Sequence, residues 1–398
     1  MRDYVAQLRA RGGLKEPALV AIAVLGLTSF AFFRVALLPE FGEELGMSTF
    51  QLGAVTTIFA AGRLVADLPG GHLADRFRAS AILTISALAV ATGSVLLGVS
   101  NGLLLLYSAS LLLGVASSTT NATGMTYFSN VTGAEFRGTS MAIFSASLLG
   151  GQALGPSAAG LVASVTGWRN AFFIAAACAA LLAVVLLVSG GRSRVVESRS
   201  NHEKSADEGQ GVTLRAMLIL QSVSFGVFLT LGSIPQTLVP VVGSDVLGLG
   251  TATIGLALGL GGVSRFVGTL IGGRLSDRLS RKAALVPALV VQGLGVGLLA
   301  LPPSVATWLA AIVLMSVASY GVSVAATIVG DLAEPGRVGR HLGRFRFVGD
   351  LGLIVGPITV SAIYEALGRE AAFLFVAAIL ITVGLLCLRF LPETTRVG

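Results

Sequence analysis

The chain contains the stretch GGHLADR at residues 70–76 and the related stretch GGRLSDR at residues 272–278. The aspartates of the two copies, Asp75 and Asp277, lie 202 positions apart. A second pattern, glycine, three other residues, then Gly-Pro, ends at Pro156 and again at Pro357, an offset of 201. Separate short matches that share one spacing indicate duplication and fusion of a half-molecule, the parallel kind of repeat found in transporters.

The composition is that of an integral membrane protein. Hydrophobic residues make up 54% of the chain and charged residues only 12%, against about 25% charged in soluble domains. Apolar runs of roughly 20 residues, long enough to cross a bilayer as helix, predict an all-α protein with twelve transmembrane helices in two pseudo-symmetric six-helix bundles. We expect spans near residues 18–38, 50–70, 79–99, 103–128, 139–165, 168–189, 214–240, 251–273, 283–301, 304–329, 343–366 and 371–391.

The repeat and the apolar runs predict three parts in the chain. Residues 1–189 would form the first six-helix bundle and residues 214–398 the second. Between them, residues 190–213 are polar and rich in Gly, Ser and charged side chains, which is typical of a flexible linker.

Basic residues are distributed unevenly over the expected loops. Of the 27 Lys and Arg, 22 fall on the side of the linker and termini, and only Arg169 and Arg369 fall on the other. Because cytoplasmic loops retain positive charge, we expect both termini and the linker to be cytoplasmic, in the cell (inner) membrane. This topology accounts for the net charge of +7 without a nucleic-acid partner.

The two Asp-Arg stretches, each at the cytoplasmic end of an expected span, resemble the signature loop of the major facilitator superfamily. The copies depart from its pattern, because Arg78-Ala79-Ser80 replaces the usual Gly and basic residues in the first and Ser280 replaces the Gly in the second. The resemblance implies alternating access, with Asp75 facing the start of the eleventh span and Asp277 the start of the fifth, and with Arg76 and Arg278 in the same gating loops. The alternative is that each Asp-Arg pair only ends its helix and anchors the topology.

The Gly-Pro pattern of the fifth span resembles the motif characteristic of drug and proton antiporters in the superfamily, with Ala159 in place of one glycine. Small residues four apart let helices approach closely, and proline permits a bend. The resemblance favours export over uptake, whereas generic small-residue packing is the simpler interpretation. The expected packing residues of the two copies are Gly151, Gly155, Pro156, Gly352, Gly356 and Pro357.

Charges inside membrane spans are candidates for coupling or gating, because each costs at least about 2.5 kcal/mol at mid-bilayer unless it is paired or wetted. Arg63 and Asp67 stand four apart in the second span, and Arg346 and Asp350 repeat that spacing in the eleventh. They could close a cytoplasmic gate or carry protons, and for a proton we favour Asp350. Arg265 corresponds to Arg63 and needs a partner elsewhere.

The resemblance places a substrate site between the two halves near the midplane, lined by the first, fourth, seventh and tenth spans. Arg34 could contact an anionic group there, or could extend to the outer surface and pair with nearby glutamates. A mixture of aromatic and amide side chains suits amphipathic organic molecules. The candidate substrate-binding residues are Phe30, Phe33, Arg34, Asn121, Gln221, Phe228, Gln236 and Tyr320.

The function that follows is secondary active transport by a monomer, with proton-coupled efflux of small amphipathic compounds or drugs preferred. Transport or exchange of an organic anion not coupled to protons is the alternative, since Ser110 stands where many proton-coupled relatives carry an arginine. A ligand sensor is a remote alternative. We expect no enzyme activity, cofactor or metal, because the three histidines are dispersed and no nucleotide-binding loop occurs.

Overall fold

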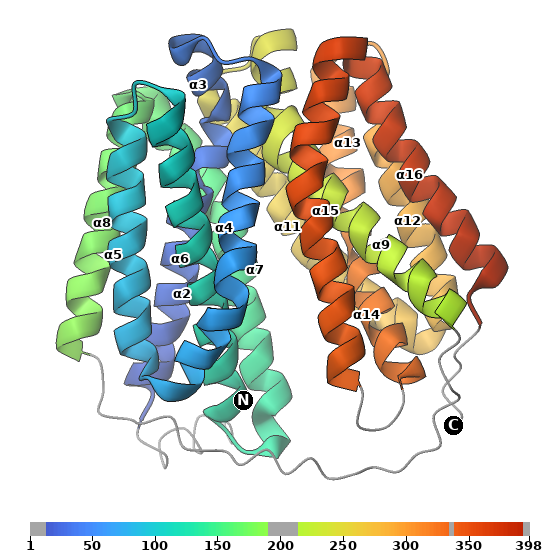
Figure 1. Cartoon of the computed structure of the whole chain (residues 1–398), viewed down its shortest axis with the longest axis horizontal. Coiled ribbons are helices and arrows are strands. Elements are labelled where there is room, and N and C mark those ends of the chain that lie inside the picture. The colour runs from blue at the N-terminus through green and yellow to red at the C-terminus, as the bar shows by residue number, and fades with distance from the viewer. Residues whose placement is uncertain (1–12, 190–213, 334–337, 393–398) are drawn as a thin grey trace. The chain divides into compact units, whose positions relative to one another are not determined.

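A computed structural model describes residues 13–189, 214–333 and 338–392, apart from the side chains of residues 68–75, 134, 214 and 277. Within these ranges all regular secondary structure is helical (Figure 1). Twelve of the described helical segments are long and apolar enough to cross a bilayer. The all-α fold with twelve spans is therefore confirmed, while the linker at 190–213 lies outside the described residues.

The spans of the first repeat begin and end within a few residues of the predicted bounds. One short helix, α3 (Leu38–Leu45), was not predicted. Pro39 is its second residue, a position where proline costs little because the N–H groups of a first turn have no helical acceptor. The other elements are α2 (Lys15–Ala36), α4 (Thr49–Arg76), α5 (Ala79–Gly98), α6 (Leu103–Asn130), the 3₁₀ turn η1 (Ala134–Phe136), α7 (Arg137–Thr166) and α8 (Trp168–Ser189).

The second repeat also supplies six spans, two of which are interrupted. The seventh span consists of α9 (Leu214–Ser233), the π-helical turn η2 (Ile234–Leu238), α10 (Val239–Val241) and a second π-helical turn η3 (Val242–Val246). The tenth consists of α13 (Val305–Val317), the 3₁₀ turn η4 (Ala318–Tyr320) and α14 (Gly321–Leu332). The continuous ones are α11 (Thr251–Arg278), α12 (Arg281–Leu298), α15 (Val338–Leu367) and α16 (Arg369–Phe390).

Two prolines explain the irregular seventh span. Pro235 and Pro240 have no N–H to donate to the carbonyls four residues earlier, those of Leu231 and Gln236. The side-chain amide of Gln236 donates to the Leu231 carbonyl at 3.3 Å, and the hydroxyl of Thr56 in α4 donates to the Gln236 carbonyl at 3.5 Å. Side chains thus satisfy backbone acceptors that cannot turn to water inside a membrane.

The contacts divide the chain into two compact units that do not coincide with the repeats. The first contains, among the described residues, 13–40, 58–189 and 250–259, and the second contains the rest. In the first, α5 packs on α6 and α8, and α2 on α7; in the second, α9 packs on α15, and α12 on α16. Each unit therefore includes a short segment of the other repeat. The division at the linker stays a prediction about how the halves are organised.

Small residues set the distance between helices inside each unit. In the first unit, a Cβ atom on Gly62 of α4 would collide with the carbonyl oxygen of Leu111, and one on Gly114 of α6 with that of Phe59. Lipid is as apolar as a protein core, so such close packing, rather than hydrophobic burial, holds membrane helices together. The crossing of α4 and α6 fixes the part of α4 that carries the charged residues described next.

Candidate functional site

Arg34 lies inside the protein, in the last turn of α2. Its side chain is 0% exposed, and its guanidinium carbon lies 4.0 Å from the ring centroid of Phe59 in α4. Phe59 in turn meets the ring of Phe32 edge-on, with centroids 5.9 Å apart. A buried guanidinium inside a span is costly, and contact with the face of an aromatic ring recovers part of that cost. Arg34 therefore does not extend to the protein surface, and its contact with a substrate stays a prediction.

Arg63 and Asp67 follow Phe59 along α4 and are both half-buried. The carboxylate of Asp67 accepts a hydrogen bond from the hydroxyl of Ser118 in α6, whose side chain is buried. Spacing along one helix pointed to Arg63 as the partner of Asp67. It could not point to Ser118, because that contact depends on the crossing of two helices.

The other candidate residues of the first unit lie on the same helices. Phe30 and Phe33 of α2 are in edge-on contact, with centroids 5.8 Å apart, and Phe33 is the more deeply buried of the two. Asn121 of α6 is half-buried. Helices α2, α4 and α6 therefore carry a group of aromatic, amide and charged side chains within this unit.

Asp350 lies on α15 in the second unit and is buried, with 8% of its area exposed, whereas Arg346 one turn earlier is exposed. The neighbouring Gly349 packs against α9 so closely that a Cβ atom there would lie 2.5 Å from the Ser224 hydroxyl and 2.9 Å from the ring of Phe228. Ser224 also donates a hydrogen bond to the Phe345 carbonyl at 2.8 Å. Asp350 is thus held where α9 and α15 are in direct contact.

The remaining candidates of the second unit are dispersed over three spans. Gln221 is half-buried on α9, and Gln236 is buried in η2. Tyr320 is buried in η4, and its ring occupies the space that a side chain at Gly272 of α11 would need. Arg265 of α11 is half-buried. The roles of all these residues in transport stay predictions.

The repeated glycines lie where helices approach backbone to backbone. On α7, a Cβ atom at Gly151 would be 2.6 Å from the Leu25 carbonyl oxygen of α2, and one at Gly155 would collide with the Ser29 carbonyl. The second copy of the pattern also lies at a close contact between two helices. Cβ atoms at Gly352 and Gly356 of α15 would meet the carbonyls of Phe225 and Leu229 in α9. Pro156 and Pro357 lie inside α7 and α15, directly after these glycines.

The two gating loops are described only in part, because the side chains of Asp75 and Asp277 lie outside the described residues. Arg76 and Arg278 are exposed. Next to the second loop, Arg281 forms an ion pair with Asp331 of α14 at 3.2 Å and donates to the Ser276 hydroxyl at 2.8 Å. From the sequence, Arg281 is expected to lie in the second copy of the signature loop and on the basic side of the membrane. The sequence does not indicate Asp331 as its partner, because the two residues belong to different spans.

Known proteins match most of the chain. The sequence is 24% identical over 375 residues to the tetracycline resistance protein, class G, of Vibrio anguillarum, which covers 89% of this chain and 91% of that protein. It is 26% identical to a chloramphenicol resistance protein of Streptomyces lividans over 65% of this chain and 66% of that protein. A hexuronate transporter of Bacillus subtilis (strain 168) is 22% identical over 88% of both chains.

Solved structures show the same fold. A bacterial homologue of the human lysosomal transporter Spinster, in an inward-facing and occupied conformation, superposes with a TM-score of 0.75 at 15% identity, covering 93% of this chain and 95% of that one. The sequence profile of the Major Facilitator Superfamily matches residues 19–271 and 216–398. With twelve spans and the repeated motif as well, the chain belongs to the Major Facilitator Superfamily and is a membrane transporter rather than an enzyme.

Proposed function

We propose that this transporter exports small amphipathic compounds in exchange for protons. The observation that carries the proposal is the packing of α7 on α2 through Gly151 and Gly155, directly before Pro156. This Gly-Pro pattern resembles the motif characteristic of drug and proton antiporters. The similarity to tetracycline and chloramphenicol resistance proteins also supports export.

Asp350 is the residue that we propose to carry the proton. It is a buried carboxylate on a membrane-spanning helix, directly beside the contact of α15 with α9. A charged carboxylate is costly in this environment, and uptake of a proton removes that cost. A change of charge at Asp350 would therefore act on the packing of two helices at once.

Proton flux in proteoliposomes tests this proposal. Tetracycline, chloramphenicol and glucuronate would be added separately to vesicles that contain the purified protein and a pH-sensitive dye. We expect tetracycline or chloramphenicol to cause proton movement that Asp350→Asn abolishes. Glu370→Gln, which removes an exposed charge at the start of α16, is the control and should behave like the native protein. Substrate movement with no proton flux in the native protein would contradict the exchange.

Transport of an organic anion is the second candidate function. It is favoured by one observation, the completely buried guanidinium of Arg34 stacked on Phe59. A fixed positive charge inside a span is suited to binding a carboxylate. The hexuronate transporter among the relatives supports this reading.

A further inference from the structure

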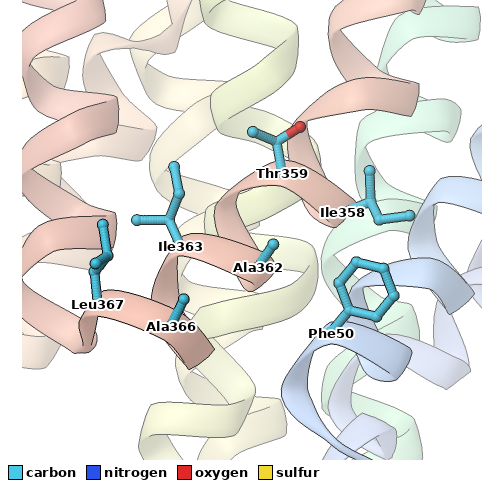
Figure 2. Close-up of a pocket in the computed structure, with 7 residues that line it drawn as sticks. All are labelled: Phe50, Ile358, Thr359, Ala362, Ile363, Ala366 and Leu367. Atoms are coloured by element: carbon cyan, nitrogen blue, oxygen red, sulfur yellow. The ribbon is translucent and has the colours of Figure 1, made fainter.

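The first turns of α4 belong to the second unit, although the rest of this helix belongs to the first. Residues 49–57 lie against α15 and against the seventh span. Beside this contact runs a groove of about 480 Å³ with apolar walls, in which Phe50 of α4 lies across from Ile358 and Ala362 of α15 (Figure 2). Helix α4 therefore contains a boundary between the two units, at residues 57 and 58, and α11 contains another, at residues 259 and 260.

The N-terminus of α4 is capped twice, once locally and once from a distant helix. Ser48 and Gln51 form a local capping box, in which the Ser48 N–H donates to the Gln51 side chain at 2.9 Å and the Gln51 N–H donates to the Ser48 hydroxyl at 3.4 Å. The N–H of Phe50, which has no acceptor within its own helix, donates to a carboxylate oxygen of Glu365 at 2.9 Å. Glu365 lies in the last turn of α15, 315 residues away.

Two threonines of α4 extend this contact along the helix. The Thr57 hydroxyl donates to the Ile354 carbonyl at 2.7 Å, in the turn of α15 that precedes Pro357. The Thr56 hydroxyl donates to the Gln236 carbonyl, which Pro240 leaves without its usual helical donor. The two hydroxyls therefore bind backbone carbonyls of two different spans, one in the π-helical turn of the seventh span and one in α15.

A glycine lets the two backbones meet between these hydrogen bonds. A Cβ atom at Gly53 would lie 2.5 Å from the Ser361 hydroxyl and 2.7 Å from the Pro357 carbonyl oxygen. There is consequently no room for a side chain at position 53, and the polar groups on both sides of it are brought within hydrogen-bond distance.

The repeat-related contact, in the first unit, is built differently. There the start of α11 lies on α7, and a Cβ atom at Gly255 would collide with the Pro156 carbonyl. By the repeat offsets of 201 and 202, Leu258 and Gly259 stand at the positions of the two threonines, and Ser164 stands at that of Glu365. The described hydrogen bond across this contact comes instead from Ser157 of α7 to the Gly255 carbonyl, at 3.2 Å.

We propose that Glu365, Thr56 and Thr57, with the N–H of Phe50, form a polar latch that holds the start of α4 on α15 in one state of the transport cycle and releases it in the other. In the predicted topology this latch faces the outer side of the membrane. The inference rests on the alternating access that the proposed function requires, and it does not depend on the substrate or on proton coupling. The threonine hydroxyls and the glutamate occur in one repeat only, so the latch makes the two repeats unequal.

Hydrogen–deuterium exchange of the full chain in nanodiscs tests the latch without a substrate. We expect Glu365→Ala and Thr57→Val each to raise exchange in the peptide covering residues 48–58 by about three- to ten-fold, as the loss of one hydrogen bond implies. The double variant should raise the exchange of this peptide further. Peptides of α5 and α8, in the other unit, should be unchanged and report that the variants are folded.

Thr359→Val is the matched control, because Thr359 lines the groove beside the latch (Figure 2) and its hydroxyl takes no part in the contacts above. It should leave exchange at residues 48–58 at the native level. The latch is wrong if Glu365→Ala and Thr57→Val leave that exchange unchanged, or if Thr359→Val raises it equally. Because exchange is measured without transport, a failure here is separate from a failure of the proton-flux experiment.

Discussion

At the scale of single residues, the buried position of Arg34 bears on the proposal that the protein transports an organic anion. Its side chain is completely buried and lies over the ring of Phe59 rather than at the protein surface. A guanidinium keeps its charge at any physiological pH and binds carboxylates with two parallel hydrogen bonds. The acidic group of a substrate that reaches Arg34 would be attracted by the positive charge and oriented by the two hydrogen bonds.

We therefore expect Arg34→Gln to weaken the apparent affinity for an acidic substrate by about ten- to a hundred-fold, the loss typical of a hydrogen bond to a charged group. Arg34→Lys, which retains the charge but not the planar fork, should lose less. Uptake of labelled glucuronate into proteoliposomes measures this, with neutral chloramphenicol as the comparison. Equal losses for both compounds would mean that Arg34 serves packing and not recognition.

At the scale of elements, the connection between α5 and α6 is held by a side chain from α8. Arg169 donates hydrogen bonds to the carbonyls of Gly98 and Ser100 at 3.0 and 2.9 Å and to the Asn101 side chain at 3.2 Å. Its guanidinium carbon also lies 4.3 Å from the ring centroid of Trp168. Sequence reasoning counted Arg169 only as one of two basic residues on the outer side, and the structure gives it a defined structural task.

Removing this side chain should loosen the connection without changing the topology. We expect Arg169→Ala to lower the free energy of unfolding by about 1–3 kcal/mol, because two backbone carbonyls lose a charged donor. Arg369, the other basic residue that the charge distribution places on the outer side, contacts only the exposed Glu370 at 3.7 Å among the contacts described for it. Arg369→Ala should therefore cost less than about 1 kcal/mol. Thermal unfolding of the two variants in the same detergent gives the comparison, and equal losses would refute it.

At the scale of the whole molecule, the distribution of positive charge predicts the orientation in the membrane. With 22 of the 27 Lys and Arg on one side, both termini should be cytoplasmic. Fusions of green fluorescent protein to either terminus should fluoresce, and fusions of alkaline phosphatase at the same positions should be inactive. A fusion of phosphatase inserted after Gly167, in the connection between α7 and α8, should be active. If the phosphatase inserted after Gly167 is inactive and the phosphatase fusions at the termini are active, the orientation is the opposite of the predicted one.

The number of spans, the repeat and the family could all be predicted from the sequence. The reason is that a membrane span has a strong local signal, about 20 consecutive apolar residues, and that a duplicated motif retains its spacing. The repeated glycines were also identified, since small residues four apart define a face of any helix. The bounds of α2 and α8 accordingly differ from the predicted ones by no more than three residues.

Tertiary structure alone decided which distant groups meet. Nothing near Asp67 in the sequence points to Ser118, and nothing near Phe50 points to Glu365, because these contacts join helices that are far apart along the chain. The interior position of Arg34 has the same cause, since an arginine in the last turn of a span can extend to the surface or turn inward. Local periodicity determines how a helix is built, whereas the geometry of helix packing determines which polar groups face each other.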